Sequence, residues 1–503
     1  MGDERHPRLA LLRFSGEFGT KARATRRHFR SRLIHNLKDA LAHHGIPPRV
    51  EVSHDRVFVA LPEDVPGLDR DGDWHRHPLA RIFGFQSLSI VERRPPSDLA
   101  AIVRDGQAIF QERVRGRRFA VRARRVGNRV ASGPHARDVE RDLGSALLHS
   151  SAGVDLEDPE VTVRVELGES GTSYFTERIP GPGGLPLGAE GSAVALMSGG
   201  FDSAVAAWQM QKRGVALDYV FCNLGGPTHL QGVVRVAKVL ADRWSYGDRP
   251  RLHAIDFEPV AAALQAHTTR RYWQLLLKRM MLRAAAGVGR RRRAPAIVTG
   301  DAVGQVSSQT LQNLTVVSRA TDQTVLRPLV GFNKDEIIEV ARHIGTFELS
   351  KVVQEYCAMV PRRPATRATL EAVEAEEEKL DPDLVERAVA TRSVLDLREL
   401  DLASVELPDL AIDRVPEGAT LIDLRPLESY RSGHHPDALH LDFGRALEAY
   451  GSFDRSSTYV LCCEYGLLSA HLAWHMRREG FRVHHFRGGQ RALMQTLAGP
   501  KRR

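Results

Sequence analysis

The stretch ALMSGGFDSAVAAW, residues 195–208, constrains the fold of this chain more than any other part of it. An apolar run ends at Met197, a glycine-rich turn follows, and a second apolar segment opens at Ala204. A strand that runs through such a turn into a helix directs backbone N–H groups and a helix dipole at an anion. The turn has no Lys followed by Ser or Thr, so it is not the common nucleoside triphosphate loop. We expect a phosphate-binding loop of another kind; for the glycines alone, a tight turn without a ligand is the alternative.

Length and composition indicate a globular chain of several domains. The 503 residues are 42% hydrophobic and 26% charged, and this length suggests about three domains. No run approaches the ~18 apolar residues of a membrane span. The first residues, MGDERHPRLALLRF, mix acids and arginines where a signal peptide needs an apolar stretch. These features predict a cytoplasmic protein without a membrane segment.

The balance of charge favours a polyanionic partner without establishing one. The chain has 71 Lys and Arg against 62 Asp and Glu, a formal net charge of +9. On a helix expected near 25–43, arginines spaced i, i+3, i+4 and i+7 share one face, and a strand within 117–129 carries two more. These predicted RNA-binding residues are Arg23, Arg26, Arg27, Arg30, Arg122 and Arg124. A solvated arginine face is the alternative; if RNA binds, we expect contacts to its backbone and shape.

Seven further motifs surround the glycine-rich turn, whose pattern SGGFDS resembles the PP-loop of ATP pyrophosphatases. They are LARIFGFQSLS (79–89), RFAVRARRVGNR (118–129), GPGGLPLG (181–188), FCNLGG (221–226), LKRMMLRAA (277–285), VTGDAVGQVSSQTLQNL (298–314) and LRPLVGFNKDEI (326–337). Together they resemble the tRNA 4-thiouridine synthase family (ThiI, tRNA sulfurtransferase) over nearly the whole chain.

This resemblance implies a multidomain α/β and α+β fold. A ferredoxin-like N-terminal module (1–75) and a THUMP RNA-binding domain (76–178) would precede a Gly- and Pro-rich linker (179–191). A doubly wound, parallel-sheet PP-loop domain that adenylates its substrate would occupy 192–385. A second linker (386–410) would lead to a rhodanese domain (411–497).

The resemblance also assigns a nucleotide site for ATP, with Asp202 as an acid that can organise Mg²⁺. No residues are assigned to a separate metal site, because the cysteines lack metal-ligand spacing. Lys334 would stabilise charge on the leaving phosphates. The nucleotide-binding residues would be Leu196, Met197, Ser198, Gly199, Gly200, Asp202, Ser203, Lys278, Gly300 and Gln309. Taken singly, Lys278, Gly300 and Gln309 could equally be an exposed lysine, a turn glycine and a helix cap.

The four cysteines divide into two groups. YVLCCEYGLLSAHLAWHM (459–476) predicts a buried strand, a turn and a helix, with backbone N–H groups converging on Cys463 and favouring an anionic sulfur. With ATLIDLRPLESYRSGHHPDALHL (419–441) it resembles a rhodanese domain, so Cys463 is the expected persulfide carrier. The resemblance implies that Cys357 forms a redox-active disulfide with Cys463. Cys462 and Cys222 are expected to be buried, and Asp423 and Arg425 to hold the fold.

The family's activity would be ATP-dependent transfer of sulfur to uridine 8 of tRNA, giving 4-thiouridine, AMP and pyrophosphate. A cysteine desulfurase would load the persulfide, and catalysis would depend on Cys463, Cys357, Asp202 and Lys334. Sulfur donation to a carrier protein of thiamine thiazole synthesis is a second role of the family. A non-catalytic RNA-binding protein with a degenerate ATPase fold is the competing hypothesis. The oligomeric state stays open, a homodimer being one possible state.

Overall fold

A computed structural model describes residues 8–53, 56–62, 77–127, 133–353, 364–405, 410–464 and 466–497. The chain forms two compact units. Unit 1 comprises Met1–Gly191, Gln211–Ala216 and Arg243–Asp248, and unit 2 comprises Ser192–Met210, Leu217–Asp242 and Arg249–Arg503. No helix in the described ranges is both long enough and apolar enough to cross a membrane.

Unit 1 is built on one nine-stranded sheet in the described part of the chain. Its longest strand, β4 (Phe85–Arg94), pairs antiparallel with β1 (Arg8–Phe14) at one end and with β8 (Gly171–Phe175) at the other. The order is β2-β3-β1-β4-β8-β7-β5-β6, and β9 pairs with β4 beside this path. The other strands are β2 (Val50–Ser53), β3 (Arg56–Leu61), β5 (Arg118–Arg125), β6 (Gly153–Val154), β7 (Val161–Gly168) and β9 (Ile179–Pro180).

The helices of unit 1 bury apolar stripes against this sheet. The stripe of α1 (Arg23–His43) joins residues of β1 and β3 in one core, and α2 (Leu99–Val114) and α3 (Ala136–Leu147) share a second core with β5 and β7. On α1 the stripe is Phe29, Leu33, Leu37 and Leu41, at a helical spacing of four. The expected α+β modules, ferredoxin-like and THUMP, are confirmed.

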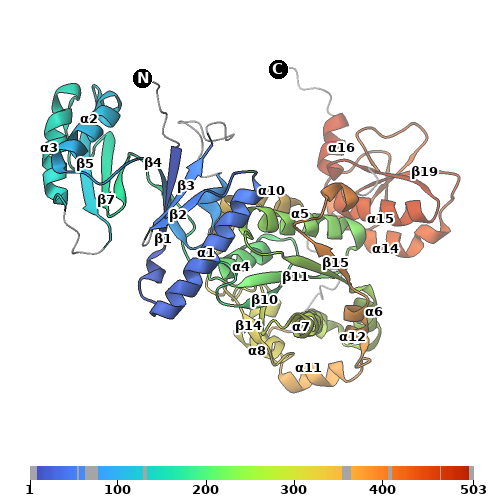
Figure 1. Cartoon of the computed structure of the whole chain (residues 1–503). Coiled ribbons are helices and arrows are strands. Elements are labelled where there is room, and N and C mark those ends of the chain that lie inside the picture. Colours follow the sequence, from blue (N-terminus) through green and yellow to red (C-terminus); the bar gives the residue numbers. More distant parts are fainter. Residues whose placement is uncertain are drawn as a thin grey trace. The chain divides into compact units, whose positions relative to one another are not determined.

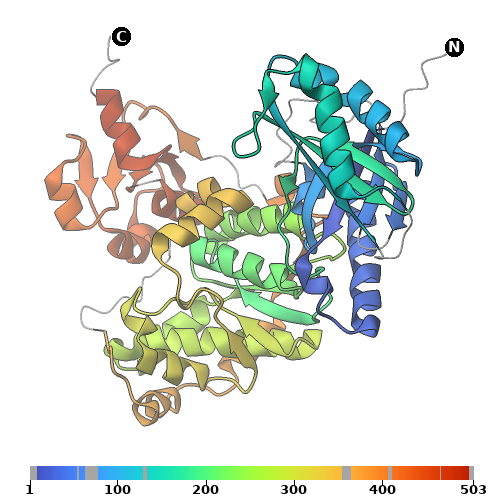
Figure 2. The same cartoon turned by 90° about the vertical axis from the view of Figure 1, so that its left-hand side faces the viewer.

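The first sheet of unit 2 has the order β14-β13-β10-β11-β12-β15. The strand pairs β10–β13, β11–β12 and β13–β14 are parallel. The edge strand β15 runs antiparallel to its neighbour β12. Figure 1 shows α4 and α5 on one side of this sheet and α7 on the other, and Figure 2 shows the same layers after a quarter turn. The doubly wound arrangement is thereby confirmed. The strands are β10 (Ser192–Leu196), β11 (Ala216–Asn223), β12 (Arg251–Asp256), β13 (Ala296–Val298), β14 (Thr324–Leu326) and β15 (Ser393–Asp396).

Most of the helices around this sheet connect successive strands. They are α4 (Phe201–Lys212), α5 (Gly226–Trp244), α6 (Glu258–His267), α7 (Trp273–Arg292), α8 (Leu311–Ser318), α9 (Lys334–Ile344), α10 (Phe347–Val352), α11 (Leu370–Glu377) and α12 (Leu384–Ala390). The segment 386–410, where the sequence suggests a linker, contributes the end of α12 and all of β15. Four residues of β15, exposed or half-buried, give no apolar alternation by which the strand could be recognised.

The C-terminal part of unit 2 is the expected rhodanese-like α/β domain. Its parallel sheet has the order β16-β20-β19-β17-β18. The strands are β16 (Ala411–Ile412), β17 (Thr420–Asp423), β18 (Ala438–His440), β19 (Thr458–Cys462) and β20 (Arg482–Phe486). The helices are α13 (Leu427–Ser432), α14 (Phe443–Ala449), α15 (Leu467–Arg478) and α16 (Gly489–Leu497).

Glu166, on β7, ties together the two halves of the unit 1 sheet. Its side chain is 6% exposed, and its carboxylate accepts hydrogen bonds from Arg13 Nε at 2.9 Å, Arg56 Nε at 3.1 Å and Arg124 Nη2 at 2.6 Å. Burial alone raises the pKa of Glu166, but the three guanidinium groups outweigh burial and hold that pKa below its usual value.

We predict that Glu166→Gln destabilises unit 1 by about 3 kcal/mol, because the buried Arg13 loses its charged partner. Glu51→Gln is the matched control: its ion pair with Arg93 leaves Glu51 56% exposed, so the loss should stay below about 1 kcal/mol. Calorimetry of the full chain measures the stability of both variants, from the unfolding transition that includes unit 1. Equal stability of the two variants would contradict the role given to Glu166.

Candidate active site

The glycine-rich loop follows the carboxyl end of β10, at the point where the strand order reverses. From β10 the chain passes through α4 to β11 on one side, while β13 and β14 lie on the other. Ligands of open α/β sheets bind at such a switch point, outside the carboxyl ends of the strands. The helix begins at Phe201, three residues earlier than the apolar pattern indicates.

The loop is held in a tight turn by its own side chains and by two valines. Ser203 Oγ donates to the Gly200 carbonyl at 3.0 Å and accepts from the Ser198 backbone N–H at 3.3 Å. Gly199 has a φ of +82°, and a Cβ there would lie 2.9 Å from a methyl of Val353 and 3.1 Å from one of Val233. Only glycine fits this position, because both the backbone angle and the space exclude a side chain.

Asp202, in the first turn of α4, meets the predicted lysine of α9. Lys334 Nζ lies 3.1 Å from Asp202 Oδ1, and Gln305 Nε2 donates to Oδ2 at 3.2 Å. The lysine side chain is 47% exposed and that of Asp202 is 21% exposed. A carboxylate and a mobile cation therefore stand beside the loop, both within reach of solvent.

Gly300 brings the segment after β13 against the start of α4. A Cβ at this residue would lie 2.7 Å from the Asp202 carbonyl carbon and 2.9 Å from the Ser203 nitrogen. The obstructing atoms are backbone, so they cannot move aside cheaply. Glycine at this position lets the two loops of the carboxyl edge touch.

Asp301, the next residue, is the site residue that the sequence reasoning missed. Its buried carboxylate accepts from Lys278 Nζ at 2.9 Å, Thr299 Oγ1 at 2.8 Å, Arg327 Nε at 3.2 Å and Gln309 Nε2 at 3.3 Å. Burial alone would raise the pKa of Asp301, but the hydrogen bonds and the charges of Lys278 and Arg327 lower it to about 2. Asp301 could have been predicted as a site residue because it is an acid that follows the end of β13 closely and stands next to Gly300.

The predicted nucleotide residues thus fall into two groups at one edge of the sheet. Asp202 and Lys334 form one, and Lys278 and Gln309 gather around Asp301 in the other. Met197 is buried, with its sulfur 3.4 Å from Ser203 Oγ, while Leu196 packs on the domain core. His229 is a further neighbour without a sequence signal: its Nε2 lies 3.4 Å from the Ser198 carbonyl, and burial lowers its pKa to about 4.

Cys463 lies at the end of β19, where the expected turn leads into α15. Its side chain is buried, 1% exposed, and its sulfur accepts a hydrogen bond from the Ser469 backbone N–H at 3.4 Å. Ser469 Oγ lies at the same distance. A Cβ at Gly489 would lie 2.3 Å from the Cys463 carbonyl oxygen, so position 489, which packs against the cysteine turn, must also be glycine.

A cavity of about 350 Å³ opens at Cys463. Its lining is Arg425, Pro426, Ser429, Ser432, Cys463, Glu464 and Leu468. Arg425 is fixed by the buried Asp423, with Nη2 to Oδ2 at 2.7 Å, and by the Gly433 carbonyl. Arg425 Nη1 also lies 3.5 Å from Glu464 Oε2, so the cavity wall carries one guanidinium and one carboxylate beside Cys463.

The other cysteines differ from Cys463 in their surroundings. Cys462 points to the opposite face of the sheet and donates to Gln490 Oε1 at 3.5 Å. Both Cys462 and Cys222 are buried, as expected, and burial raises the pKa of their thiols well above the usual range. Cys357 lies outside the described residues. Val353, four residues before it, is the neighbour of Gly199 described above, so the chain enters that segment beside the loop.

The predicted RNA-binding arginines are not equivalent. Those of α1 are all exposed, and within the described ranges none of them makes an ion pair; they are Arg23, Arg26, Arg27 and Arg30. Two of them line a surface hollow with Ser31, Ile34, His35 and Lys38. On β5, Arg124 is bound to Glu166 and Arg122 donates to the Leu156 carbonyl at 2.6 Å. The face of α1 is thus the freer positive surface.

Models of known families match four successive stretches of the chain. The descriptions are ThiI ferredoxin-like domain for residues 9–89, THUMP domain for 96–173, Thiamine biosynthesis protein (ThiI) for 188–381 and Rhodanese-like domain for 407–495. The order agrees with the sequence prediction.

Two relatives cover nearly the whole chain. Proteins named tRNA sulfurtransferase from Pyrobaculum aerophilum and Marinobacter nauticus are each 36% identical to it, over 97% and 93% of this chain and 98% and 97% of their own. A crystal structure of a 4-thiouridine synthetase–RNA complex with bound ATP matches with a TM-score of 0.66 and 29% identity, over 78% of this chain and 99% of the other. The chain belongs to the tRNA sulfurtransferase (ThiI) family, as its motifs predict.

Proposed function

We propose that this chain is an ATP-dependent tRNA sulfurtransferase that converts a uridine, at position 8, to 4-thiouridine. The observation that carries the proposal is the combination in unit 2 of a glycine-rich anion loop at a switch point with a cysteine loop of rhodanese type. Relatives named tRNA sulfurtransferase, and one solved with RNA and ATP, support the substrates.

The first step is adenylation of the uridine O4 by ATP, with release of pyrophosphate. The N–H groups of residues 198–200 and the start of α4 would bind the phosphates. Lys334 and Lys278 would stabilise the charge that develops on them. The carboxylate of Asp202 fits Mg²⁺, which prefers oxygen ligands and would neutralise phosphate charge. In the structure Lys334 and Gln305 hold that carboxylate beside the loop.

The second step delivers sulfur from Cys463. A cysteine desulfurase loads the thiolate as a persulfide, whose outer sulfur attacks C4 of the adenylated base and displaces AMP. Cys357 then attacks the Cys463 sulfur, so that 4-thiouridine leaves and a Cys357–Cys463 disulfide remains; alternatively, Cys357 attacks first and releases sulfide. Either route transfers two electrons from the cysteine pair, and a dithiol reductant must restore it. The cationic Arg425 at the cavity would stabilise an anionic persulfide.

Sulfur donation to a carrier protein for thiazole synthesis is a second candidate function. The description of the model that matches residues 188–381, Thiamine biosynthesis protein, favours it. It needs the rhodanese domain but not the RNA-binding modules, so removal of unit 1's RNA-binding modules distinguishes the two roles. Either role fits a protein of the cytoplasm, where thiols stay reduced.

We predict that Asp202→Ala lowers thiolation at least about 100-fold, because phosphate and metal handling are lost. The affinity for tRNA should remain nearly unchanged, since unit 1 is intact. Mass spectrometry of tRNA nucleosides measures the first and filter binding the second. Asp383→Ala, an exposed acid of the same unit, is the control and should be fully active. An equal loss of tRNA affinity in Asp202→Ala would count against the assignment.

We predict that replacing Arg23, Arg26 and Arg27 by Ala weakens tRNA binding and flattens the log–log salt slope by about 2, because fewer counterions are released. The control removes the same charge from the rhodanese domain at the exposed Arg431, Arg477 and Arg482. An unchanged slope in the first variant would show that this helix face is only solvated.

The two catalytic cysteines can be tested against each other. Cys463→Ser should take up no sulfur from the desulfurase, whereas Cys357→Ser should load sulfur on Cys463 and then stall. After one turnover without reductant, peptide mapping of the wild type should find a Cys357–Cys463 cross-link. Cys222→Ala should behave as wild type. Sulfur on Cys462 or Cys222, with Cys463→Ser fully active, would overturn the carrier assignment.

A further inference from the structure

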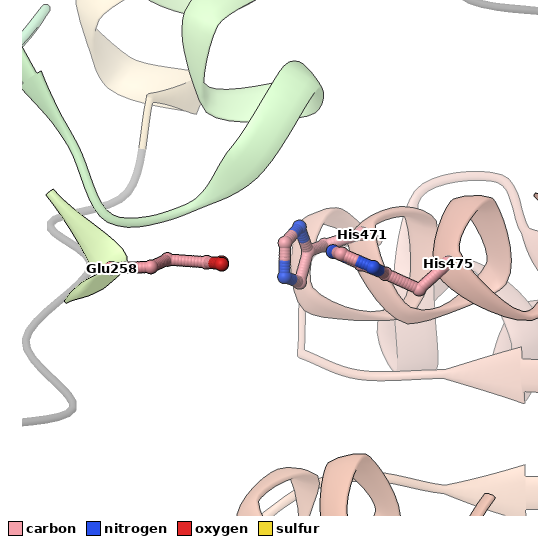
Figure 3. A group of neighbouring side chains, drawn as sticks. All are labelled: Glu258, His471 and His475. Carbon is pink, nitrogen blue, oxygen red and sulfur yellow. The ribbon is translucent and has the colours of Figure 1, made fainter. Parts of the chain in front are cut away.

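Three side chains outside the described active site point toward one another within unit 2. His471 and His475 lie one turn apart on α15, and Glu258 is the first residue of α6 (Figure 3). One ligand atom from each, two imidazole nitrogens and a carboxylate oxygen, lies within 4.8 Å of the others. Two histidines at i and i+4 share a helix face and can grip one ion.

The state of the two imidazoles suits a metal. Burial lowers the pKa of both His471 and His475, which favours the neutral imidazole, the form that offers a lone pair to a metal. A hydrogen bond between His471 and the Gly225 backbone fixes that ring. Such a contact from the second ring nitrogen is typical of metal-binding histidines.

A glycine of the nucleotide domain approaches the two rings closely. Gly226 approaches the rings so closely that a Cβ there would lie 2.7 Å from His471 Cε1 and 3.7 Å from His475 Nε2. Glu258 is exposed, so its carboxylate can swing inward by the ~1.5 Å between the 4.8 Å seen here and the ~3.3 Å ligand spacing of a tetrahedral site with bonds of about 2.0 Å. Such a set of two imidazoles and one carboxylate leaves a fourth position for water.

We propose that Glu258, His471 and His475 form a binding site for one divalent transition-metal ion, with zinc as the closest match to this donor set. The ion joins α15, the helix that follows the Cys463 loop, to the first turn of α6. Glu258 follows the end of β12 by two residues and Gly226 follows the end of β11 by three, so both belong to the carboxyl edge of the sheet that carries the glycine-rich loop. The ion therefore pins the sulfur-carrying domain to the nucleotide edge, and this role is independent of which substrate receives the sulfur.

The test starts from full-length protein that has been stripped of metal with a chelator. Zn²⁺ is then titrated in, in competition with a second, chromophoric chelator that reports free metal. The wild type should show one saturable site, and Glu258→Gln and His475→Gln should each weaken it at least about tenfold. Both changes are at an exposed or half-buried side chain, so the fold is retained. His149→Gln, an exposed histidine of unit 1, is the control and should bind as the wild type does.

A Co²⁺ titration separates this site from the thiols of Cys462 and Cys463. An imidazole–carboxylate site gives weak visible bands, whereas thiolate ligands add intense near-ultraviolet charge-transfer absorption. Metal should also slow amide hydrogen exchange in the wild type, both in residues 225–229 and in α15. In Glu258→Gln the same addition of metal should leave exchange in these segments unchanged. Absence of a saturable site, thiolate absorption alone, or equal binding by all three variants would overturn the proposal.

Discussion

The carboxyl edge of the first sheet in unit 2 depends on one buried carboxylate, that of Asp301. Lys278 comes from α7 and Arg327 follows β14, and without an anion between them these two partly buried cations would repel each other. With it, three segments of the chain are held in one arrangement. The pKa of about 2 keeps this anion ionised, so its stabilisation is present above the usual aspartate pKa and is lost only as pH falls towards 2.

Two glycines then decide how closely the parts of this edge approach. Gly300 lets the loop before Asp301 rest on the backbone of Asp202 and Ser203, and Gly199 lets the phosphate-binding turn accept Val353. Asp202 is thus placed by backbone contact as well as by its partner Lys334. A charge change at Asp202 should leave the loop itself standing, which is why Asp202 is a fair test of chemistry.

Local patterns made the main features of this protein predictable. About fifteen consecutive residues suffice to predict the strand, glycine turn and helix around 198–203. A stretch of similar length predicts the cysteine turn before α15. Contacts between segments far apart in the chain have no comparable local sequence pattern. The partners of Asp301 come from residues 278 to 327, and the Glu258 carboxylate meets histidines more than 200 positions away. Arg124 shows the same limit: alternation placed it on a strand face, but only the fold reveals Glu166 beside it.

In the mechanism proposed above, the burial of Cys463 imposes an order on sulfur transfer. At 1% exposure the thiol meets a partner only through its cavity, whose wall carries the Arg425 guanidinium. A persulfide places a second sulfur about 2.0 Å further along the bond axis, toward that opening. The outer sulfur is then the accessible nucleophile, while the inner one stays shielded by the turn that Ser469 and Gly489 define. Attack on the inner sulfur, which the proposed disulfide step needs, therefore requires this turn to open, so the burial that would protect a loaded carrier would also delay its discharge.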